Sequence, residues 1–157
     1  MLVEVKIGAL IMDPNTNTPI VVLKGVETET ILPIWVGAFE ANAIALEIEK
    51  VVPQRPMTHD LLRNLIVQSG LRAQHVIVTN LVDNTFYALI ELIDKNGEIV
   101  SLDARPSDAI ALALRLDCPI FVDQKVLDVS AASTQTENTF QTEENSPTSE
   151  DWPDFIG

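Results

Sequence analysis

The chain has little cysteine and no long apolar run, and each shortage excludes a class of protein. A lone cysteine, Cys118, rules out a disulfide framework or a cysteine-ligated metal cluster within one chain. A reducing compartment is the simplest setting, so we expect a cytoplasmic protein. Charge or proline interrupts the apolar runs within about ten residues, too short a length to span a bilayer. Residues 1–6 alternate as a strand does and do not resemble a signal peptide, so we expect no membrane association.

Basic residues are also scarce. The 157 residues contain 10 Lys and Arg against 23 Asp and Glu, a net charge of −13. Residues 129–157 hold six acidic and no basic residues, which leaves a net charge of −7 on residues 1–128. Proteins that coat nucleic acid without sequence preference carry a basic stripe, and the absence of one argues against that role.

Familiar site signatures are missing as well. The sequence has no Gly-rich phosphate loop, no Gly-x-Ser-x-Gly elbow and no His-Glu-x-x-His pair. We therefore expect no organic cofactor, and any chemistry must come from a less specific arrangement of polar side chains.

What is present is enough apolar sequence, 46% of the residues, to bury one core. Alternating or apolar segments bounded by turn residues predict strands at 2–12, 19–24, 31–36, 73–83, 85–94, 98–103 and 119–122. Helices are expected over 38–50, from Thr58 as N-cap to Gly70, and over 106–115, with a last turn at 123–129. We predict one α+β domain over residues 1–128: a mixed, largely antiparallel sheet packed with about three helices.

From Ser130 onward Ser, Thr, Gln, Asn and Glu dominate, so residues 129–157 are expected to form a disordered acidic tail. Trp152, Phe155 and Ile156 near its end have two interpretations. They are either a frayed terminus or a short peptide that docks on a protein partner or on its own domain.

The densest signal is the stretch from Asp103 to Arg115. Pro106 suits the first position of a helix, and residues 109–114 are apolar on every side, so this helix must be buried. Residues 43–46 repeat residues 109–112, each set following a strand and a turn. If the repeat is real, it predicts two equivalent strand–turn–helix units around one core.

Polar side chains gather where this helix begins. Asp103, Ser107 and Asp108 lie within six residues of one another across a turn, and their oxygens suit Mg²⁺ or Mn²⁺. Such a metal could activate water for hydrolysis. The simpler alternative is that Asp108 complements the helix N-terminus while Asp103 pairs with Arg105.

A second polar group opens the helix after Thr58. His59 could act as a general base or a metal ligand, with Asp60 orienting it or binding too. The alternative makes Thr58 the cap, Asp60 a partner of the helix dipole and His59 an exposed residue. Glu40, near the start of the first helix, has the same ambiguity, whereas His75 lies between apolar neighbours and is expected to pack.

Three blocks together resemble the bifunctional nuclease domain family across nearly all of residues 1–128. The blocks are Leu32-Pro33-Ile34-Trp35-Val36-Gly37 with Glu40-Ala41 and Ala43-Ile44-Ala45; Arg55-Pro56-x-Thr58-His59-Asp60-Leu61; and Asp103-Ala104-Arg105-Pro106-Ser107-Asp108-Ala109-Ile110-Ala111-Leu112-Ala113. The resemblance implies a compact α+β domain that forms homo-oligomers and cleaves both RNA and DNA.

Two hypotheses follow. The first is a metal-assisted phosphodiesterase in which Asp103, Asp108 and Glu40 bind Mg²⁺ or Mn²⁺, with Asp60 as a further candidate ligand. His59 moves a proton, and Arg105 and Ser107 contact the substrate. The second is a non-enzymatic oligomeric interaction or regulatory module, in which the acidic residues are helix caps and the tail recruits a partner.

Overall fold

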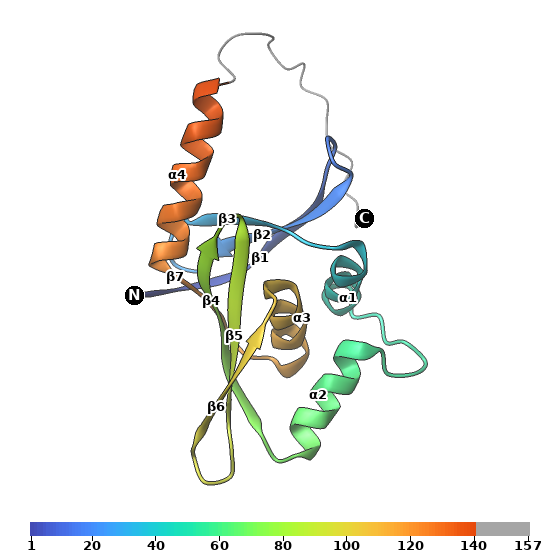
Figure 1. Cartoon of the computed structure of the whole chain (residues 1–157). Coiled ribbons are helices and arrows are strands. Elements are labelled where there is room, and N and C mark those ends of the chain that lie inside the picture. The colour runs from blue at the N-terminus through green and yellow to red at the C-terminus, as the bar shows by residue number, and fades with distance from the viewer. Residues whose placement is uncertain (141–157) are drawn as a thin grey trace.

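Seven strands form one sheet in the computed structural model, which describes the backbone of residues 1–140 and the side chains of residues 1–133. The strand order is β3-β2-β1-β7-β4-β5-β6 (Figure 1). The strands are β1 (Leu2–Asp13), β2 (Thr18–Gly25), β3 (Ile31–Trp35), β4 (Arg72–Val82), β5 (Thr85–Ile93), β6 (Ile99–Ala104) and β7 (Ile120–Asp123). The helices are α1 (Ala38–Ile48), α2 (Thr58–Gln68), α3 (Pro106–Leu116) and α4 (Gln124–Phe140).

The sheet consists of two antiparallel three-stranded meanders, each followed by a helix. In the first, β1, β2 and β3 lead into α1; in the second, β4, β5 and β6 lead into α3. Strand β7 joins them, antiparallel to β1 and parallel to β4. The predicted α+β class and the mostly antiparallel sheet are confirmed.

The two strand–helix units of the sequence repeat occupy matching places in this topology. Each begins with an edge strand, β3 or β6, and the residue directly before each helix is extended. That residue is Gly37 (φ −71°, ψ 159°) before α1 and Arg105 (φ −69°, ψ 145°) before α3. Helices α1 and α3 contact each other, so the two units meet over one core.

Local turn chemistry explains where the strands begin and end. Asp83 and Asn84 have φ of 51° and 60°, the left-handed pair that a two-residue hairpin turn requires between β4 and β5. Gly70 ends the α2 segment with φ 79°. Pro33 lies in β3, an edge strand, where its missing N–H leaves no gap within the sheet.

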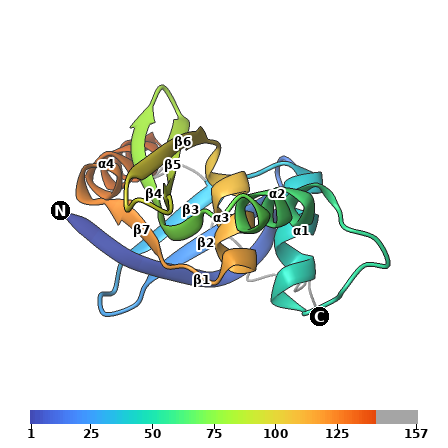
Figure 2. The same ribbon diagram turned by 90° about the horizontal axis from the view of Figure 1, so that it is seen from below.

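Helix α3 is the centre of the core, as its all-apolar sequence predicts. Residues 109–113 are buried, and the helix contacts α1, α2, β4 and β5. Figure 2 shows α1, α2 and α3 side by side next to the sheet. Alanine at 109, 111 and 113 keeps the surface of α3 small, which allows these neighbours to approach closely.

The fourth helix is longer than the single turn that the sequence predicts. Val126 is fully buried and Leu127 packs against the core, which fixes the start of α4 beside β4 and β7. From that anchor the helix continues through Phe140, so residues 130–140, expected to be disordered, are helical. Trp152, Phe155 and Ile156 lie outside the described residues. No helix within residues 1–140 is both long and apolar enough to cross a membrane.

Candidate functional site

A pocket of about 720 Å³ opens between α1, α2 and the edge strand β6, with α3 at its base. We call it the main pocket. Its apolar lining comes mainly from α2, β6 and α1. Its charged and imidazole lining consists of Glu40, His59, Asp103, Arg105, Asp108 and Arg115. The pocket therefore collects candidate residues from three parts of the chain that are far apart in sequence.

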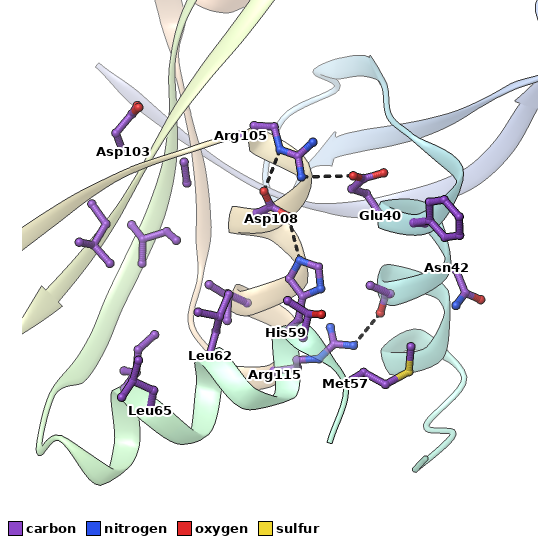
Figure 3. A pocket seen from close by; sticks show the side chains of 18 residues that line it. Glu40, Asn42, Met57, His59, Leu62, Leu65, Asp103, Arg105, Asp108 and Arg115 are labelled. Atoms are coloured by element: carbon purple, nitrogen blue, oxygen red, sulfur yellow. Dashed lines mark hydrogen bonds and ion pairs between the residues drawn. The ribbon is translucent and has the colours of Figure 1, made fainter. Parts of the chain in front are cut away.

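A chain of polar contacts links three helix starts in this pocket (Figure 3). His59 Nε2 lies 2.8 Å from Asp108 Oδ1, and Arg105 Nε donates to Asp108 Oδ2 at 2.9 Å. The same guanidinium reaches Glu40, with 3.2 Å between Arg105 Nη2 and Glu40 Oε1. Glu40 from α1, Arg105 and Asp108 from α3 and His59 from α2 thus form one continuous relay.

Helix geometry places these side chains together. Asp108 stands in the first turn of α3, three residues after Arg105, the spacing at which two side chains meet on one face. Glu40 and His59 stand in the first turns of α1 and α2, and both helices pack near α3. The packing of three helix N-termini, and no sequence motif, builds the relay.

Asp108 is held in its ionised form. Burial alone would raise its pKa, but the hydrogen bonds from Arg105 and His59 outweigh burial and hold the pKa below the ordinary value of 3.8. An ionised carboxylate only accepts hydrogen bonds, so Nε2 of His59 must carry the proton toward Asp108. Nδ1, the other ring nitrogen of neutral His59, is then a proton acceptor.

Asp60 serves a different partner from its neighbour His59. Its Oδ1 accepts from Arg115 Nε at 2.9 Å and its Oδ2 accepts from the backbone N–H of Met57 at 3.0 Å. Asp60, and not Thr58, therefore satisfies the start of α2, and the prediction of Thr58 as the cap is wrong. Arg115, only 5% exposed, also donates to the carbonyls of Ala111 and Ala43, so it ties α1, α2 and α3 together.

The remaining predicted residues fall at the edge of the site or outside it. Asp103 is exposed on β6 and lines the main pocket, but Arg105 pairs with Glu40 and Asp108, so the expected Asp103–Arg105 pair is wrong. Figure 3 shows Asp103 apart from the relay. Ser107 is buried and lines a separate hollow of about 260 Å³ beside Trp35.

Comparison with known proteins agrees with the sequence blocks. The model of the bifunctional nuclease domain matches residues 21–135, most of the chain. The chain belongs to the bifunctional nuclease domain family.

Relatives of this bifunctional nuclease domain differ in how far they match. An uncharacterized protein of Mycobacterium tuberculosis is 41% identical over 124 residues, which cover 79% of this chain and 73% of that protein. Bifunctional nuclease 1 of Arabidopsis thaliana is 31% identical over 109 residues, 68% of this chain and 34% of its own length. Bifunctional nuclease 1 of Oryza sativa subsp. japonica is 27% identical over 101 residues, covering 63% and 30%. The match spans only about a third of these plant proteins.

The metal predicted for this nuclease-family domain does not fit the arrangement of its side chains. Both carboxylate oxygens of Asp108 and one of Glu40 already form a hydrogen bond or ion pair with Arg105 or His59. Within residues 1–133 no three His, Cys, Asp or Glu side chains are grouped so as to hold a metal ion. A divalent ion at Glu40, Asp103 and Asp108 would first have to displace Arg105 from Glu40 and Asp108.

Competition between Arg105 and a metal is testable. Arg105→Gln removes the cation that occupies Glu40 and Asp108 and leaves two carboxylates close together. If these residues can hold Mg²⁺ or Mn²⁺, the variant should bind Mn²⁺ more tightly than wild type in a calorimetric titration. Undetectable binding to both proteins would contradict the predicted metal set.

Two residues of this bifunctional nuclease domain were not identified from sequence. In the sequence, Arg115 is recognisable only as the end of a buried helix. Its role depends on a carboxylate and a carbonyl from two other helices. Phe39 gives no sequence signal, yet it lines the main pocket and is 90% exposed. An apolar helix that ends in arginine is the one pattern that could have pointed to Arg115.

The Asp60–Arg115 pair predicts how stability depends on pH. Burial raises the pKa of Asp60, but the Met57 N–H and Arg115 together lower it below 3.8. Because the folded pKa is depressed, the pair's stabilising contribution is present above the unfolded pKa and is lost as pH falls through the folded value. Urea unfolding should therefore show a wild-type advantage over Asp60→Asn at pH 7 and pH 5 that shrinks below pH about 3.8. A constant difference down to pH 3 would contradict this.

Proposed function

We propose that this domain hydrolyses phosphodiester bonds in RNA and DNA at the main pocket. The observation that carries the proposal is the 2.8 Å contact between His59 and Asp108, next to an exposed arginine. The plant relatives are named bifunctional nucleases, which supports the same reaction class.

His59 supplies the proton transfer in this proposal. With Nε2–H directed to Asp108, Nδ1 accepts a proton from the attacking oxygen, which is water for DNA and water or the 2′-hydroxyl for RNA. The ionised Asp108 then stabilises the imidazolium that forms. The attacking oxygen bonds to phosphorus, the ester oxygen departs, and that oxygen takes up a proton from His59 or solvent.

Arg105 holds the phosphate. Its Nε and Nη2 are bound by Asp108 and Glu40, which fixes the plane of the guanidinium and leaves Nη1 for a phosphate oxygen. The side chain is 66% exposed, so a substrate can reach it. Glu40 and Asp108 therefore orient the arginine in addition to neutralising it.

The test compares two carboxylates that contact histidines. Asp108→Asn keeps the shape of the side chain but removes the charge that orients and stabilises His59. The matched control is Glu91→Gln, because Glu91 Oε2 lies 3.1 Å from His75 Nε2 on the sheet, outside the main pocket. Highly purified Asp108→Asn should lose most of its activity on RNA and DNA, while Glu91→Gln keeps it. Equal activity of Asp108→Asn and wild type would point to another site or a contaminant.

A non-enzymatic oligomeric module is the second candidate function. Exposed apolar side chains outside the main pocket favour it: Val52, in the connector between α1 and α2, is 89% exposed, and Ile31 on the edge strand β3 is 62% exposed. A second copy of the chain could cover them, as expected for a homo-oligomer. Sedimentation equilibrium of wild type and Val52→Asp measures this assembly. If the domain is such a module, the Asp108→Asn variant would form the same oligomer as wild type.

A further inference from the structure

The main pocket has apolar surface on two sides of its relay. On the α1 side stands Phe39, next to Glu40 in the chain, and on the other side stand Leu62 and Leu65 of α2 and Leu102 of β6. Figure 3 shows Leu62 and Leu65 along α2, with Leu65 further from Arg105 than His59 is. A ligand whose phosphate meets Arg105 would therefore place its neighbouring groups against apolar side chains.

Charge alone cannot supply affinity for a polyanion here. The pocket lining contains Arg105 and Arg115 against Glu40, Asp103 and Asp108, and residues 1–128 have a net charge of −7. Arg115 is buried in its own pair with Asp60, so Arg105 is the cation in this lining that can meet a phosphate. Duplex binders gain most of their affinity by neutralising many phosphates, and this pocket offers about one such contact.

Phe39 points to bases as the other source of affinity. Its aromatic side chain is 90% exposed at the edge of the pocket, so the ring is accessible for a ligand to stack on. Nucleobases stack on aromatic rings with little dependence on sequence, and they are accessible in single strands but not in a duplex. Cleavage of both RNA and DNA also requires recognition that ignores the sugar.

We infer that the main pocket selects single-stranded nucleic acid. The phosphate lies at Arg105 and His59, the base on one side of it stacks on Phe39, and the base on the other side contacts Leu62, Leu65 and Leu102. This inference rests on the proposed function and adds the substrate class and its specificity-determining residue, Phe39. Because about one phosphate is neutralised, the dependence of affinity on salt is shallow.

Binding to uncleaved oligonucleotides tests the inference separately from catalysis. In the His59→Ala protein, fluorescence anisotropy measures the Kd of a labelled single-stranded DNA and of its duplex. The single strand should bind more tightly, and log K against log salt should have a slope of about −0.7 for one phosphate. Adding Phe39→Ala or Leu65→Ala should weaken single-strand binding about tenfold, within the range for loss of one stacked base, whereas Phe39→Trp should retain it.

The chain offers matched controls. Leu61 and Leu65 lie on the same helix with exposures of 62% and 61%, but Leu61 is outside the pocket lining. Tyr87 is an exposed aromatic residue on β5, also outside it. Leu61→Ala and Tyr87→Ala should leave the Kd unchanged.

Three results would overturn the inference: equal or tighter binding of duplex, an unchanged Kd in both Phe39→Ala and Leu65→Ala, or a change only in oligomer size. The last would make this surface an interface between copies of the chain.

The outcomes also separate the inference about the substrate class from the proposed hydrolysis. An active wild type whose Phe39→Ala and Leu65→Ala variants both keep the Kd for the single strand would refute the substrate class alone. Phe39-dependent binding by an inactive wild type would refute the hydrolysis alone.

Discussion

Replacing His59 by alanine is expected to lower kcat for RNA and DNA hydrolysis by about 10² to 10⁴, the contribution of a well-placed general base. The imidazole is bonded to an ionised Asp108, stands in the main pocket and presents its second nitrogen as the proton acceptor. Loss of the imidazole removes the proton transfer, but Arg105 keeps its ion pairs with Glu40 and Asp108. KM should therefore change much less than kcat in steady-state assays.

The second histidine of the chain is the control. His75 also contacts a carboxylate, Glu91, and packs edge-on against Phe121 with ring centroids 5.5 Å apart. This confirms the packing role expected from its sequence neighbours. His75→Ala should lower stability and leave kcat of the folded protein intact. An equal loss of kcat in both variants would show that the activity does not depend on the main pocket.

Asp60→Ala is expected to destabilise the fold by about 3 kcal/mol, the low end of the range for breaking a buried ion pair. The side chain of Arg115 is 5% exposed, so without Asp60 its charge is left buried, while the N–H of Met57 at the start of α2 loses its acceptor. The low end applies because Asp60 itself is 24% exposed and its pair is partly solvated. Urea unfolding at pH 7 measures the change.

A double variant shows whether the pair is the cause. Arg115→Met alone should also destabilise, whereas Asp60→Ala with Arg115→Met should cost less than the sum of the two, because no buried charge remains unpaired. Strict additivity would contradict the role of this ion pair. Asp60 was a catalytic candidate from its position beside His59. The folded fraction of Asp60→Ala is expected to keep most of its kcat.

Features governed by local patterns could be predicted from the sequence. The apolar run at 109–114 requires a buried helix, and α3 is one. Asp83-Asn84 and Asn96-Gly97, residue pairs that favour tight turns, do form turns between strands. Pro33 lies in an edge strand, the position that proline favours within a sheet. Each of these depends on a few neighbouring residues whose conformational preferences are strong.

Pairings between distant residues could not be predicted. Arg105 lies two residues after Asp103 in the sequence, yet its partners are Asp108 and Glu40, the latter from another helix. His59 and Asp108 are 49 positions apart, and Asp60 and Arg115 are 55 apart. These contacts depend on how α1, α2 and α3 pack, which single-residue patterns do not encode. The sequence therefore identified most members of the site but not its connections.

A double-mutant cycle on His59 and Asp108 tests the central claim most directly. Initial rates on a single-stranded RNA and a single-stranded DNA would be measured for wild type, His59→Ala, Asp108→Asn and the double variant, all purified identically. If Asp108 acts through His59, the double variant should be no slower than His59→Ala alone. Losses that multiply across the two sites, or four proteins with equal rates, would contradict the account.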